Sequence, residues 1–384
     1  MSRLDELIAE LCPSGVKYVP LKQIAEVGTG SSDRVNAVDD GEYPFYVRSK
    51  NILRSNRYLF DEEAIIIPGE GGIGDIFHYV NGKYDLHQRA YRIHLIDPNV
   101  NTKFTYYCLS ANFKKFIIMK AVNATVTSIR KPMIENFPIP LPPLPVQQEI
   151  VRILDDLTKA TTELNKELNI ELEARRKQYE YYIDRVINAN NYQHIPLNDV
   201  AKVYDGTHQT PNYTESGVKF VSVENINDLY GTTKRISEVD FSKYKIKPQP
   251  GDVFMTRIGD VGTPAVVTTN EPIAYYVSLA LIRPNKELLP QYLYFYIKSS
   301  AFRKELYKRT LHTAVPIKIN KEDIGKCRVA VPPIKEQQRV IALLSRFDTL
   351  CNDISSGLPA EIEARQKQYE YYRDKLLTFK EVTG

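Results

Sequence analysis

The chain carries the decapeptide EARRKQYEYY at residues 173–182 and EARQKQYEYY at residues 363–372, so nine of ten positions agree at a spacing of 190 residues. The same offset aligns Pro142-Pro143 with Pro332-Pro333 and Gln147-Gln148 with Gln337-Gln338. Chance does not produce such agreement. The chain is therefore a tandem duplication, and a duplicated chain can hold a partner at two places related by pseudo-twofold symmetry.

Composition indicates a soluble globular protein. A length of 384 residues is enough for two or three domains with their own cores, and 43% apolar and 26% charged residues are ordinary values. The four cysteines show no C-x-x-C spacing, which argues against disulfides and structural zinc and for a reducing compartment. Neither a signal peptide nor a membrane span is recognisable. We therefore expect a cytoplasmic protein without a membrane partner.

Positive charge is concentrated locally although the net charge is only +4. Residues 103–131 hold six Lys or Arg and no acidic residue, and residues 298–321 hold seven against Glu305 alone, so each window has a charge of +6. Two such windows at matching places predict two contacts with a polyanion. The alternative is that each window is a solvated basic face.

Each copy has the same order of segments: a mixed region rich in strand signals, a proline-rich hinge, and a helical segment. Val19-Pro20-Leu21 precedes Ile195-Pro196-Leu197 by 176 residues, so the second mixed region is longer than the first by 190 minus 176, or 14 residues. The predicted boundaries are an N-terminal helical segment at 1–15, mixed domain 1 at 16–143, a central helix at 144–192, mixed domain 2 at 193–333 and a distal helix at 334–384.

The helical segments have long apolar stripes. From Val146, apolar residues recur every three or four positions to about Ile187, which predicts a helix of about 40 residues or roughly 60 Å. Matching stripes in the two copies favour an antiparallel pair, although each stripe could instead cover its own domain. Gly357 and Pro359 should interrupt the second helix. The decapeptide tyrosines favour helix packing over base stacking.

The chain has no recognisable active-site motif. Residues 69–74 fit G-x-G-x-x-G, but a strand pattern follows instead of the required helix, so we predict a turn between strands that allows close approach to a phosphate backbone. Phosphate-binding G-x-x-x-x-G-K-[ST], H-E-x-x-H and G-x-S-x-G sequences are absent, as is the Asn-Pro-Pro-aromatic sequence of amino-methyltransferases. The expected fold class is α+β: two mixed domains in pseudo-twofold repeat, separated by long antiparallel helices.

Binding residues are easier to propose than catalytic ones. The polar loop at 205–211 contains Gly and Pro, which are typical of turns, and can present its His and Gln to base edges. Arg257 precedes a turn from which it could reach guanine or phosphate. Residues 48–51 and 87–89 are the proposed counterparts in the first copy, and residues before each hinge are proposed strand-end contacts. The candidate DNA-binding residues are Arg48, Ser49, Lys50, Asn51, Gln88, Arg89, Ser128, Arg130, Lys131, Thr207, His208, Gln209, Thr210, Arg257, Lys318, Asn320 and Lys321.

Taken together, these features resemble the specificity subunit of a type I restriction-modification system. The residues that carry the resemblance are the Pro-Pro-hydrophobic-x-x-Gln-Gln sequences at 142–148 and 332–338, the Arg-x-Lys-Gln-Tyr-Glu-Tyr-Tyr helix motif, the Glu-Leu repeat at 163–172 and the Asp-Gly-Thr-His-Gln-Thr-Pro loop. In that family each mixed domain is a target recognition domain that reads one half of a split DNA sequence. The resemblance also implies that the helices set the unread gap and that the N-terminal segment packs near the C-terminal helix.

The resemblance implies partners instead of catalysis. Such a subunit binds double-stranded DNA and recruits two methyltransferase subunits and, through the assembled complex, restriction subunits. It would bind no cofactor itself; S-adenosylmethionine, ATP and Mg²⁺ are expected on the partners. Two alternatives remain open: the specificity half of a fused or type IIG-like restriction-methylation enzyme, and a coiled-coil adaptor with no DNA role.

Overall fold

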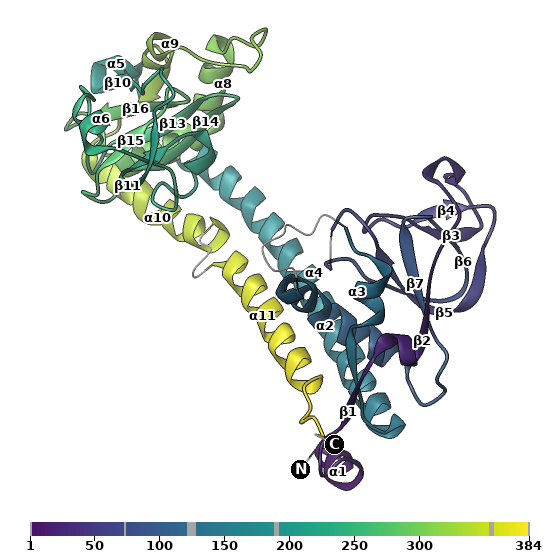
Figure 1. Ribbon diagram of the computed structural model, residues 1–384. Helices are drawn as coiled ribbons and strands as arrows, with labels where there is room; N and C mark the ends of the chain where they lie inside the picture. Colours follow the sequence, from purple (N-terminus) through teal and green to yellow (C-terminus); the bar gives the residue numbers. More distant parts are fainter. Residues whose placement is uncertain (1, 73, 121–127, 188–191, 353–356, 383–384) are drawn as a thin grey trace. The chain divides into compact units, whose positions relative to one another are not determined.

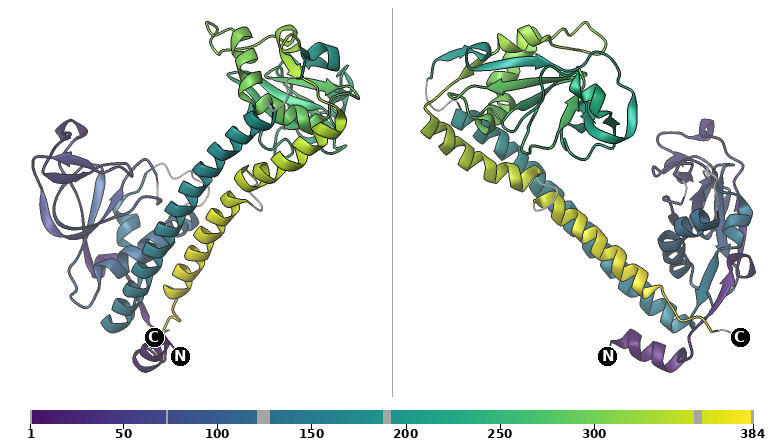
Figure 2. Two further views of the ribbon diagram at one scale, coloured as in Figure 1. Left: turned by 180° about the vertical axis from the view of Figure 1, so that it is seen from behind. Right: turned by 60° about the vertical axis from the view of Figure 1, so that its left-hand side comes forward.

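A computed structural model describes all residues except 1, 73, 121–127, 188–191, 353–356 and 383–384 (Figure 1). The chain forms two compact units, residues 1–167 with 362–384 and residues 168–361. Each unit contains one mixed domain together with parts of both helical segments (Figure 2). The division therefore lies within both helical segments.

Mixed domain 1 is built on a six-stranded sheet in the order β2-β7-β5-β6-β3-β4. Helix α2 (Thr102–Lys120) supplies Phe104 and Phe113 to the core that it shares with Ile65 and Ile93 of the sheet. The short helix α3 (Lys131–Glu135) follows. The remaining elements are β2 (Ala25–Thr29), β3 (Tyr43–Tyr46), β4 (Leu53–Ser55), β5 (Phe60–Pro68), β6 (His78–Leu86), β7 (Ala90–Leu95), η1 (Leu21–Gln23) and η2 (Arg34–Asn36).

Mixed domain 2 repeats this topology with the sheet divided in two, in the orders β10-β16-β13-β14 and β12-β11-β15. The division arises because two short strands, β14 and β15, take the place of the long strand β6. The elements are β10 (Ala201–Asp205), β11 (Tyr213–Val221), β12 (Arg235–Ile236), β13 (Val253–Ile258), β14 (Asp260–Val266), β15 (Ile273–Tyr275), β16 (Leu279–Pro284), α5 (Leu197–Val200), η3 (Val223–Asn225), α6 (Glu238–Ser242), α7 (Pro290–Lys298), α8 (Ser300–Arg309) and α9 (Lys321–Gly325).

Backbone hydrogen bonds place the two mixed domains in a common register. Ser32 donates to the carbonyl of Leu86 at 3.2 Å, as Thr207 donates to that of Tyr275 at 3.1 Å. Gly69 accepts from the amide of Ile129 at 2.8 Å, just as Arg257 accepts from that of Ile319 at 3.0 Å. Ser32 therefore corresponds to Thr207 and Gly69 to Arg257. The expected glycine turn at 69–74, of which residue 73 lies outside the described part of the chain, falls between the two strands β5 and β6, as predicted.

The hinges hold the same structure in both copies. In mixed domain 1, β8 (Pro138–Leu141) pairs antiparallel with β1 (Lys17–Pro20). In mixed domain 2, β17 (Arg328–Ala330) pairs with β9 (His194–Pro196) in the same way. Each hinge strand therefore belongs to a two-stranded sheet and has one edge without a partner strand. Prolines are tolerated at such an edge because no amide donor is needed there.

The first glutamine of each Gln-Gln pair is buried and makes the same three hydrogen bonds. Gln147 Nε2 donates to the carbonyls of Pro142 and Asn99 at 2.7 and 3.0 Å, and its Oε1 accepts from the Asn101 amide at 2.8 Å. Gln337 repeats the pattern. Its Nε2 donates to the carbonyls of Pro332 and Glu287 at 2.8 and 2.7 Å, and its Oε1 accepts from the Leu289 amide at 2.8 Å. This glutamine ties the hinge to the loop that precedes α2 in mixed domain 1 and to the loop that precedes α7 in mixed domain 2.

The helical segments match the prediction closely. Helix α4 (Leu144–Ile187) has 44 residues and continues from the first unit into the second, whereas the distal segment is divided into α10 (Ile334–Asn352) and α11 (Leu358–Leu376). The break expected at Gly357 and Pro359 is confirmed: Gly357 lies just before α11 and Pro359 in its first turn, while residues 353–356 lie outside the described part of the chain. In Figures 1 and 2, α10 and α11 run alongside α4.

Within each unit, one decapeptide tyrosine joins the paired helices. Tyr179 donates to Asp348 at 2.8 Å in the second unit, and Tyr369 and Thr158 hydroxyls are 2.9 Å apart in the first. The chain ends also meet in the first unit. The amide of Val16 donates to Lys380 at 2.8 Å, and Leu4 of α1 (Arg3–Leu11) shares a core with Leu377, so the N-terminal helix packs near the C-terminal one as expected.

Candidate nucleic-acid interface

In mixed domain 1 the candidate residues gather around a pocket of about 390 Å³. Four connections meet there: those after β2, β3 and β6, and the glycine turn between β5 and β6. Of the candidate residues, Arg48, Ser49 and Asn51 line this pocket. The polar side chains that line the pocket are those of Arg34, Arg48, Ser49, Asn51, Glu70 and His87.

Buried His87 organises the loop after β6. Its Nδ1 accepts from the Arg89 amide at 3.0 Å, and its Nε2 lies 3.3 Å from Asp33 Oδ1. Gln88 Nε2 donates to the same carboxylate at 3.2 Å. Hydrogen bonds from the Arg34 amide and from His87 hold the pKa of Asp33 below its ordinary value. The side chains of Gln88 and Arg89 remain exposed at this surface, where they could meet a ligand.

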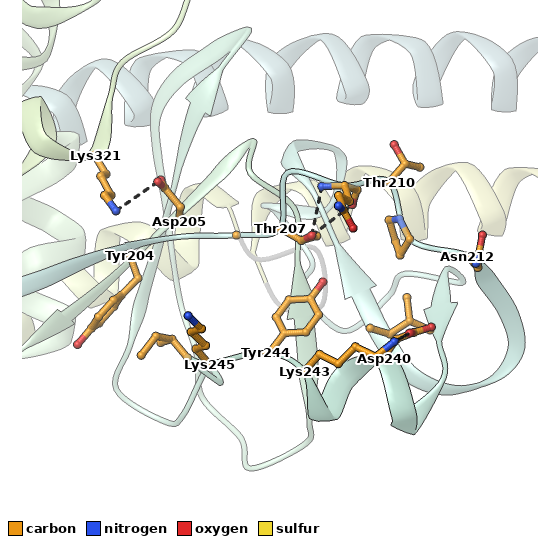
Figure 3. A pocket seen from close by; sticks show the side chains of 15 residues that line it. Tyr204, Asp205, Thr207, Thr210, Asn212, Asp240, Lys243, Tyr244, Lys245 and Lys321 are labelled. Atoms are coloured by element: carbon orange, nitrogen blue, oxygen red, sulfur yellow. Dashed lines mark hydrogen bonds and ion pairs between the residues drawn. The ribbon is translucent and has the colours of Figure 1, made fainter.

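In mixed domain 2 a larger pocket of about 640 Å³ opens beside the loop at 205–211 (Figure 3). Thr207, Gln209 and Thr210 line one wall, and Tyr244 lines it from another segment of the chain. His208 belongs to the same loop and is exposed. Burial raises the pKa of Tyr244 to about 12, so its hydroxyl keeps its proton at neutral pH and can donate a hydrogen bond. The pocket thus presents neutral donors and acceptors of the kind that read base edges.

Acidic and basic side chains border the same pocket. Lys321 Nζ lies 3.7 Å from Asp205 Oδ2 (Figure 3). Lys243 donates to Asp240 at 2.7 Å. Both of these lysines are paired with a carboxylate, and Lys245 adds one further positive charge to the lining, so the pocket offers polar groups together with a small excess of positive charge.

Arg257 lies in the interior of mixed domain 2. It is buried, its Nε donates to the carbonyl of Ile319 at 3.0 Å, and its Nη1 pairs with Asp205. The guanidinium therefore packs against Asp205 at the start of the loop at 205–211 and does not lie at the surface, where the sequence analysis expected it to reach DNA. Its counterpart in mixed domain 1 is Gly69, so this support exists in one copy only.

The residues before the hinges start short helices, which corrects the expected strand-end placement. Arg130 caps α3 and Lys131 is its first residue, while Asn320 caps α9 and Lys321 is its first residue. A residue before proline, or one that opens a helical turn, can look like the end of a strand in sequence. Ser128 precedes buried Ile129, whose amide donates to the carbonyl of Gly69, and Lys318 precedes buried Ile319, whose amide donates to that of Arg257. The residues before each hinge therefore lie next to the end of β5 or of β13.

Sequence reasoning missed residues that the fold brings to these sites. The counterpart of the 205–211 loop in mixed domain 1 is the loop at 30–36, which contains Ser32, Asp33 and Arg34. Glu70 was seen only as part of a glycine pattern, and Tyr244 comes from a segment far from the loop that it faces. Short polar loops without Gly-Pro punctuation give little sequence signal, and only the sheet register identifies them. Lys50 lies in the turn at 48–51, and its role stays a prediction.

The matched family model decides the relationship. The model for the type I restriction modification DNA specificity domain matches twice, at residues 13–174 and 190–364. The chain belongs to this family. Each match covers one mixed domain, its hinge and most of the following helical segment, so the internal repeat of the sequence is the repeat of the family domain.

Curated relatives support the same assignment along most of the chain. The chain is 29% identical to a putative type I restriction enzyme specificity subunit of Haemophilus influenzae over 95% of its own length and 96% of that protein. It is 31% identical to the EcoR124I/EcoR124II specificity subunit of Escherichia coli over 74% of its own length and 72% of that protein. The alignment with the Haemophilus influenzae protein therefore covers both copies of the repeat in this chain.

Solved structures show the same fold. A chain from a study of complex assembly and conformational transition in the type I restriction-modification system aligns over 95% of this chain and 98% of its own length, with a TM-score of 0.66 and 16% identity.

The described part of the present chain has no helix long and apolar enough to cross a membrane.

Proposed function

We propose that the chain is the subunit that reads a split, asymmetric DNA target, with mixed domain 1 on one half-site and mixed domain 2 on the other. One observation carries this proposal. The two domains share a hydrogen-bond register, yet equivalent positions hold unlike side chains, such as His87 against Tyr276 and Gly69 against Arg257. A common frame with different side chains supports two readers of different sequence.

The helical segments fit a second role, which is to fix the gap between the half-sites and to hold two methyltransferase subunits. Helix α4 is about 66 Å long at 1.5 Å per residue, and it is continuous through both units. Tyr181 and Tyr371, at equivalent decapeptide positions, are 57% and 63% exposed. Because an exposed position has no packing reason to stay identical, its identity in both copies supports binding of the same partner twice.

The chain itself is proposed to be non-catalytic. S-adenosylmethionine would then be bound by the methyltransferase subunits, and ATP and Mg²⁺ by restriction subunits that join the complex. The competing function is a restriction-methylation enzyme of which this chain is the specificity half. A methylation assay separates the two: the chain alone with S-adenosylmethionine and DNA should show no methyl transfer, whereas turnover by the isolated chain would contradict the proposal.

DNA binding separates the proposal from a coiled-coil adaptor. Phosphate contacts release counterions, so the affinity for duplex DNA should fall with a log–log salt slope of roughly −0.9 for each phosphate contacted. The measurement is fluorescence anisotropy of a labelled duplex, titrated with the chain bound to its methyltransferase partner at several salt concentrations. Binding that is absent or independent of salt would favour the adaptor.

A further inference from the structure

Glu70 holds two arginines of mixed domain 1 at once. Arg48 Nη1 lies 2.9 Å from Glu70 Oε2, and Arg89 Nη1 lies 3.2 Å from the same oxygen. The three residues come from three different connections: the turn after β3, the glycine turn between β5 and β6, and the turn between β6 and β7. The sheet therefore brings together a carboxylate and two guanidiniums that are distant in sequence.

The cluster is open to solvent and keeps hydrogen-bonding capacity. The side chains of Arg48, Glu70 and Arg89 are 43%, 40% and 58% exposed. Glu70 is the only acceptor that contacts either guanidinium among the described residues, so the Nε–Nη2 edge of each arginine retains two parallel donors. Hydrogen bonds from Arg48 and then Arg89 hold the pKa of Glu70 below its ordinary value, so it is an acceptor at neutral pH.

These donors and this acceptor match one base pair. In the major groove, guanine presents two acceptors, N7 and O6, and its cytosine presents the N4 donor. An arginine edge bonds both guanine acceptors, and a carboxylate oxygen accepts from cytosine N4. An A·T pair fits worse because the N6 donor of adenine would meet an arginine donor.

A phosphate fits this cluster less well than a base edge does. The two arginines and Glu70 together carry one net positive charge, and Asp33 borders the neighbouring loop, so these two carboxylates offset much of the attraction that an incoming phosphate would meet. A base edge is neutral and polar. The carboxylate also keeps the guanidinium planes in place, which lowers the entropic cost of bidentate recognition.

The cluster is absent from the corresponding place in mixed domain 2. The common register puts Ile258 where mixed domain 1 has Glu70, and Ser278 where it has Arg89. Any recognition that depends on the cluster therefore belongs to one half-site.

We propose that Glu70, Arg48 and Arg89 form a reading unit for a G·C base pair in the half-site of mixed domain 1. This inference rests on the proposed function and specifies one base pair of its target. One of the two arginines bonds N7 and O6 of guanine through its Nε–Nη2 edge, the other holds Glu70 in place through its ion pair, and Glu70 accepts from cytosine N4.

The test uses the full chain assembled with its methyltransferase partner. Methylated adenines are first mapped in cells to obtain the target. The map is repeated with Gln209→Ala, and the half-site whose sequence preference relaxes is the one read by mixed domain 2. Duplexes are then made with single 7-deazaguanine substitutions, which remove N7 and leave every phosphate intact. Wild type should lose about 5- to 150-fold in affinity at one guanine of the other half-site. One of the two single variants, Arg48→Ala or Arg89→Ala, should abolish that sensitivity, because N7 accepts a single hydrogen bond.

Two further variants sharpen the test. Glu70→Gln should raise affinity for unrelated duplexes, because a negative charge is removed, and should lower the ratio of specific to unrelated binding. Lys114→Ala is the matched control: Lys114 pairs with Asp75 at 2.6 Å beside the same glycine turn, and its loss should leave guanine sensitivity unchanged.

Each other outcome overturns a stated claim. A mixed domain 1 half-site without G·C would overturn this inference and leave the proposed function intact. Uniform weakening by the arginine variants on all duplexes, with a shallower salt slope, would make them phosphate contacts and also overturn it. A map without any recurring target would overturn the proposed function and this inference with it.

Discussion

At the residue scale, Asp348 is the carboxylate that fastens mixed domain 2 to its helices. It accepts from Tyr179 at 2.8 Å, from Tyr294 at 3.1 Å and from Lys298 at 2.7 Å. Burial disfavours its charged form, but the ion pair with Lys298 and these hydrogen bonds outweigh burial and hold the pKa of Asp348 below its ordinary value. The carboxylate is therefore more favourable in the folded than in the unfolded chain.

A depressed pKa in the folded state gives stability that is present above the unfolded pKa and is lost as pH falls through the folded one. Unfolding by urea should therefore show that wild type loses stability below about pH 4, the ordinary Asp range. Asp348→Asn should be less stable at pH 7 and should lack this part of the acid dependence. Equal acid dependence of the two proteins would contradict the assigned role.

Particular residues show what sequence could and could not predict about the sites. Gly-Pro punctuation correctly located the 205–211 loop, and the turn at 48–51 proved to be part of a pocket. Arg257 was expected at the surface and is buried, because an arginine before a turn has the same sequence signal whether it faces solvent or pairs with an aspartate across the sheet. Glu70 and Tyr244 were missed because they depend on contacts between distant segments.

At the element scale, the repeated Gln-Gln pair combines one buried and one exposed glutamine. Gln147 and Gln337 each satisfy three backbone groups, whereas Gln148 and Gln338 are exposed. This explains why the pair recurs at the hinge: the buried member connects helix, hinge and mixed domain.

Replacement of Gln337 by alanine should lower the free energy of unfolding by about 2–4 kcal/mol, because buried backbone groups lose their partners. Gln338→Ala should change it by less than about 0.5 kcal/mol, the usual effect of a surface substitution. Urea titration followed by circular dichroism measures both. Comparable losses for the two variants would show that the hydrogen bonds of Gln337 are not responsible.

Helical elements were predictable to within a few residues, and the mixed domains were not. Apolar spacing from Val146 to Ile187 predicts α4 as one amphipathic helix, although its apolar side is buried towards both ends and Leu164 in the middle is 37% exposed. The break near Gly357 followed from the restrictions on proline in a helix. By contrast, the sheets pair strands from distant parts of the sequence, and the splitting of β6 into β14 and β15 leaves no local signal.

At the scale of the whole molecule, the duplication separates residues with internal roles from residues that face outward. Tyr179 is buried and Tyr369 is bonded to Thr158, as expected for helix packing. Tyr181 and Tyr371 are exposed, contrary to that expectation. Their identity in both copies is what a repeated partner surface requires.

The double variant Tyr181→Ala with Tyr371→Ala should weaken binding of both methyltransferase subunits by at least about 10-fold each, since exposed tyrosines are frequent interface anchors. Each single variant should leave one strong site. Analytical ultracentrifugation with the methyltransferase subunit gives the stoichiometry directly, and thermal unfolding of the isolated variants checks that they remain folded. Two strong sites retained by the double variant would place the partner elsewhere.

The most direct test of the central claim is to map methylated adenines in the DNA of cells that carry this chain with its methyltransferase partner. Two mixed domains with unlike side chains on one frame predict a split target whose two halves differ and whose unread gap has one fixed length. A single continuous target, two identical halves, or no recurring target would contradict the account.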